Sequence, residues 1–262
     1  MCYIVRPRFA KGPAPVTPIL IIPARMGSQR LPGKPLADIA GSPMIVHVWR
    51  RAVAAAIGPV VVAAAEAEIA AAVEAAGGRA VLTPPELPSG SDRVHAALAL
   101  ADPGGAHDVV VNIQGDFPTL DPADIRAVLE PLADPAVDIG TLCAPLGRPE
   151  ERDLANVVKP AVVFAPGARV ARVPYFSRLP VPSGDGPVYH HIGFYAYRRA
   201  ALDRFVSLPP SPLELREKLE QLRAVEAGMV IAARLIDSVP IGVDTMEELE
   251  RARAALAAGM DR

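Results

Sequence analysis

Three cations lie on one short loop near the start of the chain: Arg25, Arg30 and Lys34, with glycines at positions 27 and 33 between them. The loop follows a run of branched apolar residues, 19–22, that is typical of a buried strand. Glycine lets backbone N–H groups come close to a ligand, and several cations can surround a polyanion. The pattern therefore predicts a triphosphate site directly after a strand.

This loop differs from the P-loop of ATPases and GTPases. Its two glycines, Gly27 and Gly33, are separated by five residues, one more than that motif has. Lys34 is followed by Pro35, where a P-loop has the Ser or Thr that holds Mg²⁺. We therefore expect a nucleotide-binding enzyme outside the P-loop class. The alternative, an ordinary solvated cationic loop, fits the position after a buried strand less well.

Two aspartates stand at turns much farther along the chain. Asp116 follows the apolar run 108–113, and Asp244 precedes a predicted helix. Each carboxylate could simply cap the next helix. Beside a triphosphate, each close pair of like charges costs about 4 kcal/mol at ~4 Å and an effective dielectric of about 20, unless Mg²⁺ lies between them. Two carboxylates that share an empty metal site repel each other. Replacing either aspartate with Asn would therefore maintain or raise the thermal stability of the nucleotide-free protein.

Predicted strands and helices alternate around these motifs, which indicates a largely parallel sheet covered by helices. Ser42 and Pro43 are expected to open the first helix, as its N-cap and first residue. Further strands are predicted at residues 59–63, 79–82, 108–113 and 137–144. Ligands of such sheets bind beyond the carboxyl ends of the strands, where the cationic loop and Asp116 both fall.

The second half of the chain is less regular. Strands are predicted at 157–164 and 191–198, with an extended segment at 175–178 between them. This stretch could form a small lobe inserted into the main domain. No linker interrupts the chain, so we expect a disordered extension over residues 1–17 and a single domain over 18–262.

Two capping boxes predict the last helices. Ser211 with Glu214 opens a helix that should run to about residue 227, and Thr245 with Glu248 opens the final one. In the first of these helices, apolar residues at 215, 219 and 222 form one stripe, and polar residues at 217, 220 and 221 share another face.

Composition excludes several classes of protein. With 262 residues, a net charge of −2 and a pI near 6.2, the chain has no electrostatic footprint for nucleic acid or an anionic membrane. No uninterrupted apolar stretch is long enough to span a bilayer. Its two cysteines suggest no disulfide framework, and Cys143, in an apolar run, is expected to be a core residue of a protein from a reducing compartment.

The ordered set of short motifs resembles the 3-deoxy-D-manno-octulosonate (Kdo) cytidylyltransferases, also called CMP-Kdo synthetases. The opening Pro-Ala-Arg-x-x-Ser-x-Arg-Leu-Pro-Gly-Lys-Pro-Leu at 23–36 is followed by matches at 88–93, 112–116, 175–178, 191–195, 211–214, 219–223 and 242–245. The resemblance implies a Rossmann-like nucleotidyltransferase fold with a mostly parallel, mixed sheet. It also implies transfer of CMP from CTP to the anomeric hydroxyl of Kdo, Mg²⁺ as cofactor, a homodimer, and a cytoplasmic step of lipopolysaccharide biosynthesis.

The same resemblance assigns roles to individual residues. Arg25 and Lys34 contact the triphosphate, with Arg30 less clearly placed, and Asp116 and Asp244 bind Mg²⁺. The base and ribose region is assigned to Ser89, Gly90 and Arg93. The acidic sugar is assigned to Gln114, Arg178, His191, Tyr195, Glu220 and Gln221. Of the adjacent His190 and His191 only one can enter the pocket, because successive strand residues point to opposite faces, and we choose His191.

The chain departs from the family pattern at Ala64-Ala65, where many members have Thr-Asp, at Phe117, where Glu is common, and at His190, where Arg is common. Two alternatives to a Kdo cytidylyltransferase remain, of which the second is suggested by Ala64-Ala65. One is a cytidylyltransferase for another acidic sugar, such as 8-amino-Kdo or a sialic acid. The other is a nucleotide-binding module without catalytic activity.

Overall fold

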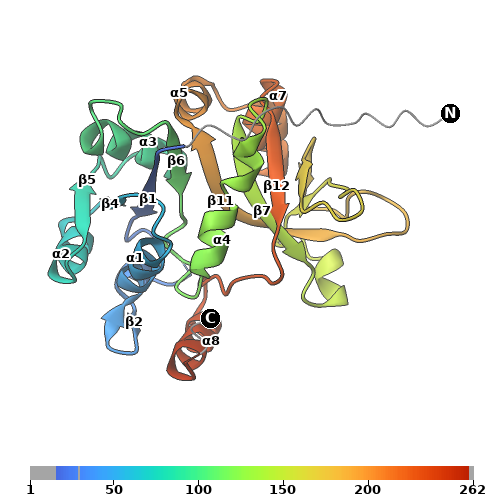
Figure 1. Cartoon of the computed structure of the whole chain (residues 1–262). Helices are drawn as coiled ribbons and strands as arrows, with labels where there is room; N and C mark the ends of the chain where they lie inside the picture. The colour runs from blue at the N-terminus through green and yellow to red at the C-terminus, as the bar shows by residue number, and fades with distance from the viewer. Residues whose placement is uncertain (1–15, 29, 260–262) are drawn as a thin grey trace.

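A single mixed sheet organises the computed structural model, which describes residues 16–28 and 30–259. The sheet has eight strands in the order β5-β4-β1-β6-β11-β7-β12-β9 (Figure 1). Neighbours from β5 to β6 are parallel, as are β7 and β12, whereas β11 runs antiparallel to both β6 and β7. The predicted class, a mostly parallel mixed sheet flanked by helices, is confirmed. Of the extension predicted over residues 1–17, residues 1–15 lie outside the described residues, and Thr17 is hydrogen-bonded to Ala106 and Asp108.

The strands of the sheet are β1 (Pro18–Ala24), β4 (Val60–Ala64), β5 (Arg79–Leu82), β6 (Val109–Asn112), β7 (Ile139–Pro145), β9 (Val170–Arg172), β11 (Tyr189–Arg198) and β12 (Ile231–Leu235). The α-helices are α1 (Met44–Ala54), α2 (Ala67–Ala75), α3 (Gly90–Ala101), α4 (Pro122–Ala127), α5 (Arg199–Ser207), α6 (Pro212–Glu217), α7 (Leu222–Glu226) and α8 (Met246–Ala257). The short 3-10 helices are η1 (Lys34–Leu36), η2 (Glu130–Ala133) and η3 (Pro149–Arg152).

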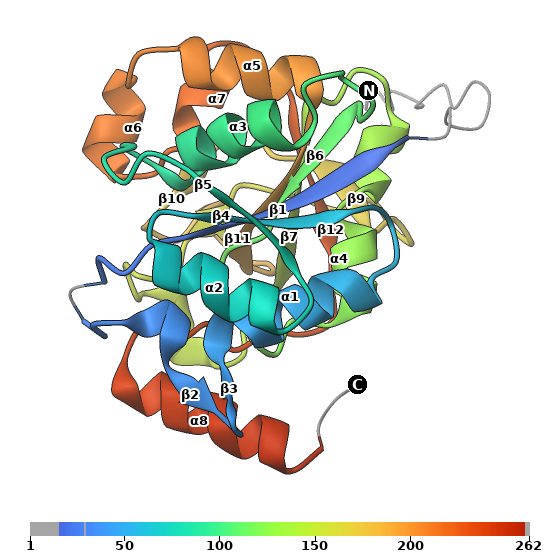
Figure 2. The same cartoon turned by 90° about the vertical axis from the view of Figure 1, so that its left-hand side faces the viewer.

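Two apolar cores cover the two faces of the sheet. Alternate residues of each strand enter opposite cores, as the period of a strand requires: Ile22 packs with α1, α2 and α4, and Ile21 packs with α3, α5 and α7. Figure 2 shows these two groups of helices on opposite sides of the sheet. Helix α8 lies apart from both, against the hairpin of β2 (Asp38–Ile39) and β3 (Ser42–Pro43).

The inserted lobe contains less regular structure than predicted. Of the strand expected at 157–164 only β8 (Lys159–Pro160) forms, and it pairs with β10 (Phe176–Ser177) from the segment expected to be extended. Strands β12 and β9 had no sequence prediction. β12 lies beside β7, where three of its five residues are buried, so its short mixed pattern gives little alternation to recognise.

The helix predicted from Ser211 to residue 227 is wrong beyond its first turns. Its capping box forms as expected, but Lys218 adopts a left-handed conformation with φ of 55° and ends α6. α7 starts four residues later, so Glu220 and Gln221 lie at the turn between two short helices. The predicted stripe also fails, because Leu215 is 65% exposed whereas Leu219 and Leu222 are buried.

The other helix starts are closer to prediction. Ser42 and Pro43 form β3 rather than a cap and first turn, so α1 begins at Met44. Thr245 caps α8 through the predicted capping box, and Asp121 caps α4. Across the described parts of the chain, no helix has both the length and the apolar character needed to cross a membrane.

Candidate active site

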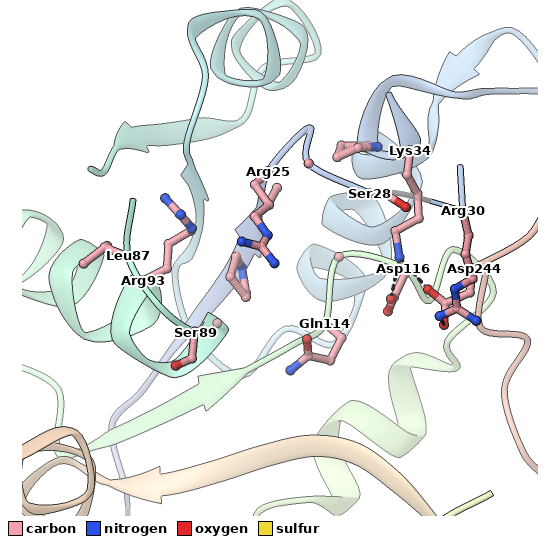
Figure 3. Close-up of a pocket in the computed structure, with 16 residues that line it drawn as sticks. Arg25, Ser28, Arg30, Lys34, Leu87, Ser89, Arg93, Gln114, Asp116 and Asp244 are labelled. Atoms are coloured by element: carbon pink, nitrogen blue, oxygen red, sulfur yellow. Dashed lines mark hydrogen bonds and ion pairs between the residues drawn. The ribbon is translucent and has the colours of Figure 1, made fainter. Parts of the chain in front are cut away.

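A cavity of about 520 Å³ lies beyond the carboxyl ends of β1 and β6. Its walls are the loop after β1, the N-terminus of α3 and the turn after β6, with Asp244 closing one side (Figure 3). Eight of the residues predicted from the sequence line it: Arg25, Lys34, Ser89, Gly90, Arg93, Gln114, Asp116 and Asp244. The single site expected at this edge of the sheet is therefore present as a shared cavity.

Lys34 lies at the centre of the charged side of the cavity. Its position follows from Gly33, whose φ of 69° turns the chain into η1, and from Pro35, which is buried behind it. The Lys34 ammonium donates to Asp116 at 2.9 Å and to Asp244 at 3.0 Å. Two aspartates distant in sequence thus converge on one cation, as predicted for their shared location.

The backbone explains this convergence. The Val243 N–H donates to the Asp116 carbonyl at 2.9 Å, so the segment before α8 is bound directly to the turn after β6. Phe117 packs against Gly242, where an added Cβ would lie 3.1 Å from the phenyl ring. Gly115 is required nearby, since its Cβ would meet the Pro23 carbonyl oxygen at 2.9 Å. The departure at Phe117 therefore has a structural role in joining the two acidic segments.

Neither acidic residue is a helix cap. The N-cap of α4 is Asp121, and that of α8 is Thr245. The Asp244 carboxylate instead accepts from Lys34 and forms an ion pair with Arg30 at 2.8 Å. The site is thus not an empty acidic pair, and the expectation that Asn would maintain or raise stability loses its basis.

The charges in this cluster stabilise the charged forms of Lys34 and Asp244, whereas burial and the nearby Asp244 raise the pKa of Asp116 despite its bond to Lys34. Burial alone would lower the pKa of Lys34, but the two carboxylates outweigh it and hold this pKa above its usual value. Burial would likewise raise the pKa of Asp244, and the bonds from Lys34 and Arg30 instead lower it. Lys34 is therefore an ammonium, and Asp244 a carboxylate, at neutral pH.

The two carboxylates also fit a divalent cation. Both lie within 3.0 Å of one ammonium, so a cation already occupies the space between them. Among the residues that the structure describes, no cluster of three or more His, Cys, Asp or Glu side chains could hold a metal. Mg²⁺ is commonly bound by one or two carboxylates with phosphate oxygens and waters completing its shell. Asp116 and Asp244 are the residues that would hold it.

The opposite wall is formed by the start of α3. Ser89 is the N-cap and accepts from the Asp92 N–H, and Gly90 is the first helical residue. This N-terminus offers backbone N–H groups and a positive dipole to an anion. The Arg93 guanidinium, in contrast, is nearly buried and donates to Thr83 and to the carbonyls of Pro84 and Pro85, so it holds the loop before α3.

Glu66 supports the cationic loop through a hydrogen bond that was not predicted from the sequence. Its carboxylate accepts from the Met26 N–H at 3.0 Å, next to Arg25. Glu66 directly follows Ala64-Ala65, where the chain departs from the family pattern. A loop N–H bonded to a side chain forty positions away leaves no local sequence signal.

The five other residues predicted for the sugar do not line the cavity. Arg178 donates through its guanidinium to the carbonyls of Ala155, Glu217 and Lys218. These bonds tie the inserted lobe to the end of α6. In this state of the protein, Arg178 joins two parts of the fold.

The remaining four lie in the core between the sheet and α3, α5 and α7. His191 is 6% exposed, its Nε2 lies 3.0 Å from the Thr141 hydroxyl, and burial lowers its pKa to about 3. Its ring lies between Phe176 and Tyr195. Glu220 accepts from the Ser91 hydroxyl at 3.1 Å, and Gln221 is buried at the start of α7. His190, on the other face of β11, has a buried Nδ1 with no hydrogen-bond partner.

Comparison with known proteins agrees with this geometry. A family profile described as cytidylyltransferase matches residues 19–231. The structure of CMP:2-keto-3-deoxy-manno-octonic acid synthetase complexed with CTP superposes with a TM-score of 0.84 at 38% identity, over 93% of this chain and 99% of that one. A nucleotidyl transferase from Methanothermobacter shares only the fold, at 15% identity and a TM-score of 0.59.

The fold and the cavity therefore define a nucleotidyltransferase of the cytidylyltransferase class. The curated relatives are more specific. The 3-deoxy-manno-octulosonate cytidylyltransferase of Parvibaculum lavamentivorans is 64% identical over 92% of this chain and 93% of its own length. That of Paramagnetospirillum magneticum is 62% identical over 94% of this chain and its whole length. The chain belongs to the 3-deoxy-manno-octulosonate cytidylyltransferase family.

Proposed function

We propose that this protein transfers CMP from CTP to the anomeric hydroxyl of Kdo, with release of pyrophosphate. The observation that supports this most strongly is the cluster of Lys34, Asp116 and Asp244 beside the α3 N-terminus, in a fold that superposes on a CTP-bound synthetase. We expect Arg25, Lys34 and the α3 N-terminus, which line this cavity, to hold the triphosphate. Catalysis then consists of positioning and of charge neutralisation at the α-phosphate, with no covalent intermediate.

Asp116 and Asp244 would hold Mg²⁺, which neutralises phosphate charge when it is bound. Gln114 follows β6 and lines the cavity, and we expect it to contact the sugar. Burial keeps His191 neutral, because its pKa is lowered to about 3. The carboxylate of an acidic sugar would therefore need a cation other than His191.

The test is pyrophosphate release with CTP and Mg²⁺ in the presence of Kdo, 8-amino-Kdo or a sialic acid. We expect release with Kdo at a higher kcat/KM than with the other acids. Release only with a sialic acid or with the 8-amino sugar would show that this acid, and not Kdo, is the substrate. Tight CTP binding without release on any acid would support a non-catalytic module, the alternative raised by Ala64-Ala65.

We further propose a homodimer acting in the cytoplasm, in lipopolysaccharide biosynthesis. The substrate named for the relatives is a sugar acid, and CTP is a cytoplasmic nucleotide. In the inserted lobe, Val163 and Leu179 are 77% and 69% exposed, and we expect a second copy to cover them. Sedimentation equilibrium should give twice the chain mass, and Leu179→Glu should shift it toward the monomer; a wild-type monomer at micromolar concentration would contradict this proposal.

A further inference from the structure

Lys34 occupies the place in the cavity where a metal would be expected. Its ammonium lies 2.9 Å from an Asp116 oxygen and 3.0 Å from an Asp244 oxygen, and only 16% of its side chain is exposed. Arg30 completes the cluster at 2.8 Å from the other oxygen of Asp244. Two cations therefore balance two carboxylates, and the cluster has no net negative charge to attract a divalent ion.

Lys34 and a divalent ion cannot share this space. An ion bound to both carboxylates would sit about 2.0–2.1 Å from their oxygens if it were Mg²⁺. It would then lie in the volume that the ammonium occupies and repel it strongly at such short range. Metal binding between Asp116 and Asp244 therefore requires the ammonium to leave.

The fold allows the side chain to leave without moving the loop. The backbone of Lys34 is fixed by η1 and by the buried Pro35, but four methylenes separate the ammonium from this anchor. The same cavity is lined by Arg25 and the α3 N-terminus, the groups positioned for phosphates. A triphosphate there would give the Lys34 ammonium another anionic partner when a metal ion enters the space between the two carboxylates.

We propose that Lys34 acts as a placeholder cation: it neutralises Asp116 and Asp244 in the nucleotide-free protein and moves to the phosphates when nucleotide and metal enter together. This inference rests on the proposed function for the identity of the metal site. It predicts that the free protein binds divalent cations weakly, although two converging carboxylates are present. By linkage, nucleotide and metal then strengthen each other's binding by equal factors.

The experiment is titration of the nucleotide-free protein with Mn²⁺ alone, read as free Mn²⁺ by electron paramagnetic resonance. Lys34→Met removes the ammonium and keeps the length of the side chain, so Mn²⁺ should bind at least about tenfold more tightly than to the wild type, within the range of ordinary coupling. Lys34→Arg keeps the charge and should bind as weakly as the wild type. Adding Asp244→Asn to Lys34→Met should abolish the gain.

Arg25→Met is the matched control, because Arg25 lines the same cavity and no ion pair is found for it among the described residues. It should leave Mn²⁺ affinity within about twofold of the wild type. If Mn²⁺ affinity rose equally in the Arg25 and Lys34 variants, the overall charge of the cavity would explain the effect, and the placeholder would be overturned. Tight Mn²⁺ binding by the wild type would overturn it directly, even if Lys34→Met and Lys34→Gln both failed to fold.

Failure of the proposed function would appear elsewhere, as absence of pyrophosphate release with CTP and Kdo. In that case, tighter Mn²⁺ binding by Lys34→Met would still support the placeholder, since the titration contains neither substrate. Conversely, normal turnover with unchanged Mn²⁺ affinity would reject the placeholder and leave the function intact.

Discussion

The two groups of predicted site residues differ in how the protein holds them. Those assigned to the triphosphate and metal line an open cavity and bond mainly to one another, as Lys34 does with Asp116 and Asp244. Most of those assigned to the sugar are buried or bonded to backbone, as His191 and Arg178 are. The first region is prepared for a ligand before it arrives. The second would have to rearrange before it touched one.

This contrast has a physical origin. Charged groups around a cavity can neutralise one another and remain near solvent, so they need little of the fold to stabilise them. Polar groups in the core depend on protein partners in place of water, so most of these residues bond to the scaffold, although a buried oxygen of Glu220 has no partner. We expect substitutions in the first region to reduce turnover and those in the second to reduce stability.

The largest effect is expected for Asp116→Asn. It removes one unit of charge facing the phosphates and should lower kcat by about 10²–10³-fold, as loss of one transition-state electrostatic partner does. Steady-state pyrophosphate release measures this. Because Lys34 would lose one of two carboxylates, the ligand-free variant should also unfold at a slightly lower temperature than the wild type. A fully active variant would show that Asp116 has no role in catalysis.

Arg178→Met tests the second region. It removes three donors from the carbonyls of Ala155, Glu217 and Lys218, of which the bond to Glu217 is partly buried and the other two are exposed, and a typical lost bond costs about 1 kcal/mol. Urea unfolding should show a loss of about 2–3 kcal/mol, with KM for CTP unchanged. A variant of wild-type stability whose KM for Kdo alone rises strongly would instead show that Arg178 binds the sugar directly.

The burial of His191 predicts a pH dependence of stability. Its pKa is lowered from 6.5 to about 3 in the folded state, so below pH 6.5 only the unfolded chain takes up the proton. The stability present above pH 6.5 is therefore lost as pH falls, by up to about 1.4 kcal/mol per unit. His191→Gln should unfold with a shallower pH dependence between pH 6.5 and 4. Identical slopes would mean that His191 is solvated.

Glu66→Ala should have the smallest effect. It removes the carboxylate that accepts from the Met26 N–H and so loosens the loop that carries Arg25. KM for CTP should rise by about fivefold with kcat little changed, which corresponds to one hydrogen bond of about 1 kcal/mol. Glu66→Gln keeps an acceptor oxygen and should restore KM. A large fall in kcat in both variants would place Glu66 in the catalytic step itself.

The features that were predicted from the sequence have strong local patterns, and those that were missed depend on contacts between distant residues or on an unusual backbone conformation. The cationic loop and Asp116 follow strands with strong local patterns, so their meeting at one sheet edge was predictable. The break at Lys218 was not, because a left-handed residue other than glycine has no clear signal and the capping box before it indicates a continuous helix. Lys34 between the carboxylates was also missed, since bonds over 82 and 210 positions depend on the folded backbone.

The most direct test of the account is a crystal structure with CTP and Mn²⁺, read through the anomalous scattering of the metal. We predict one manganese peak in contact with carboxylate oxygens of both Asp116 and Asp244, with the Lys34 ammonium moved from between them to a phosphate oxygen. A peak that contacts only one of the two, or carboxylates that still hold Lys34 while CTP occupies the cavity, would contradict the shared metal site on which the account depends.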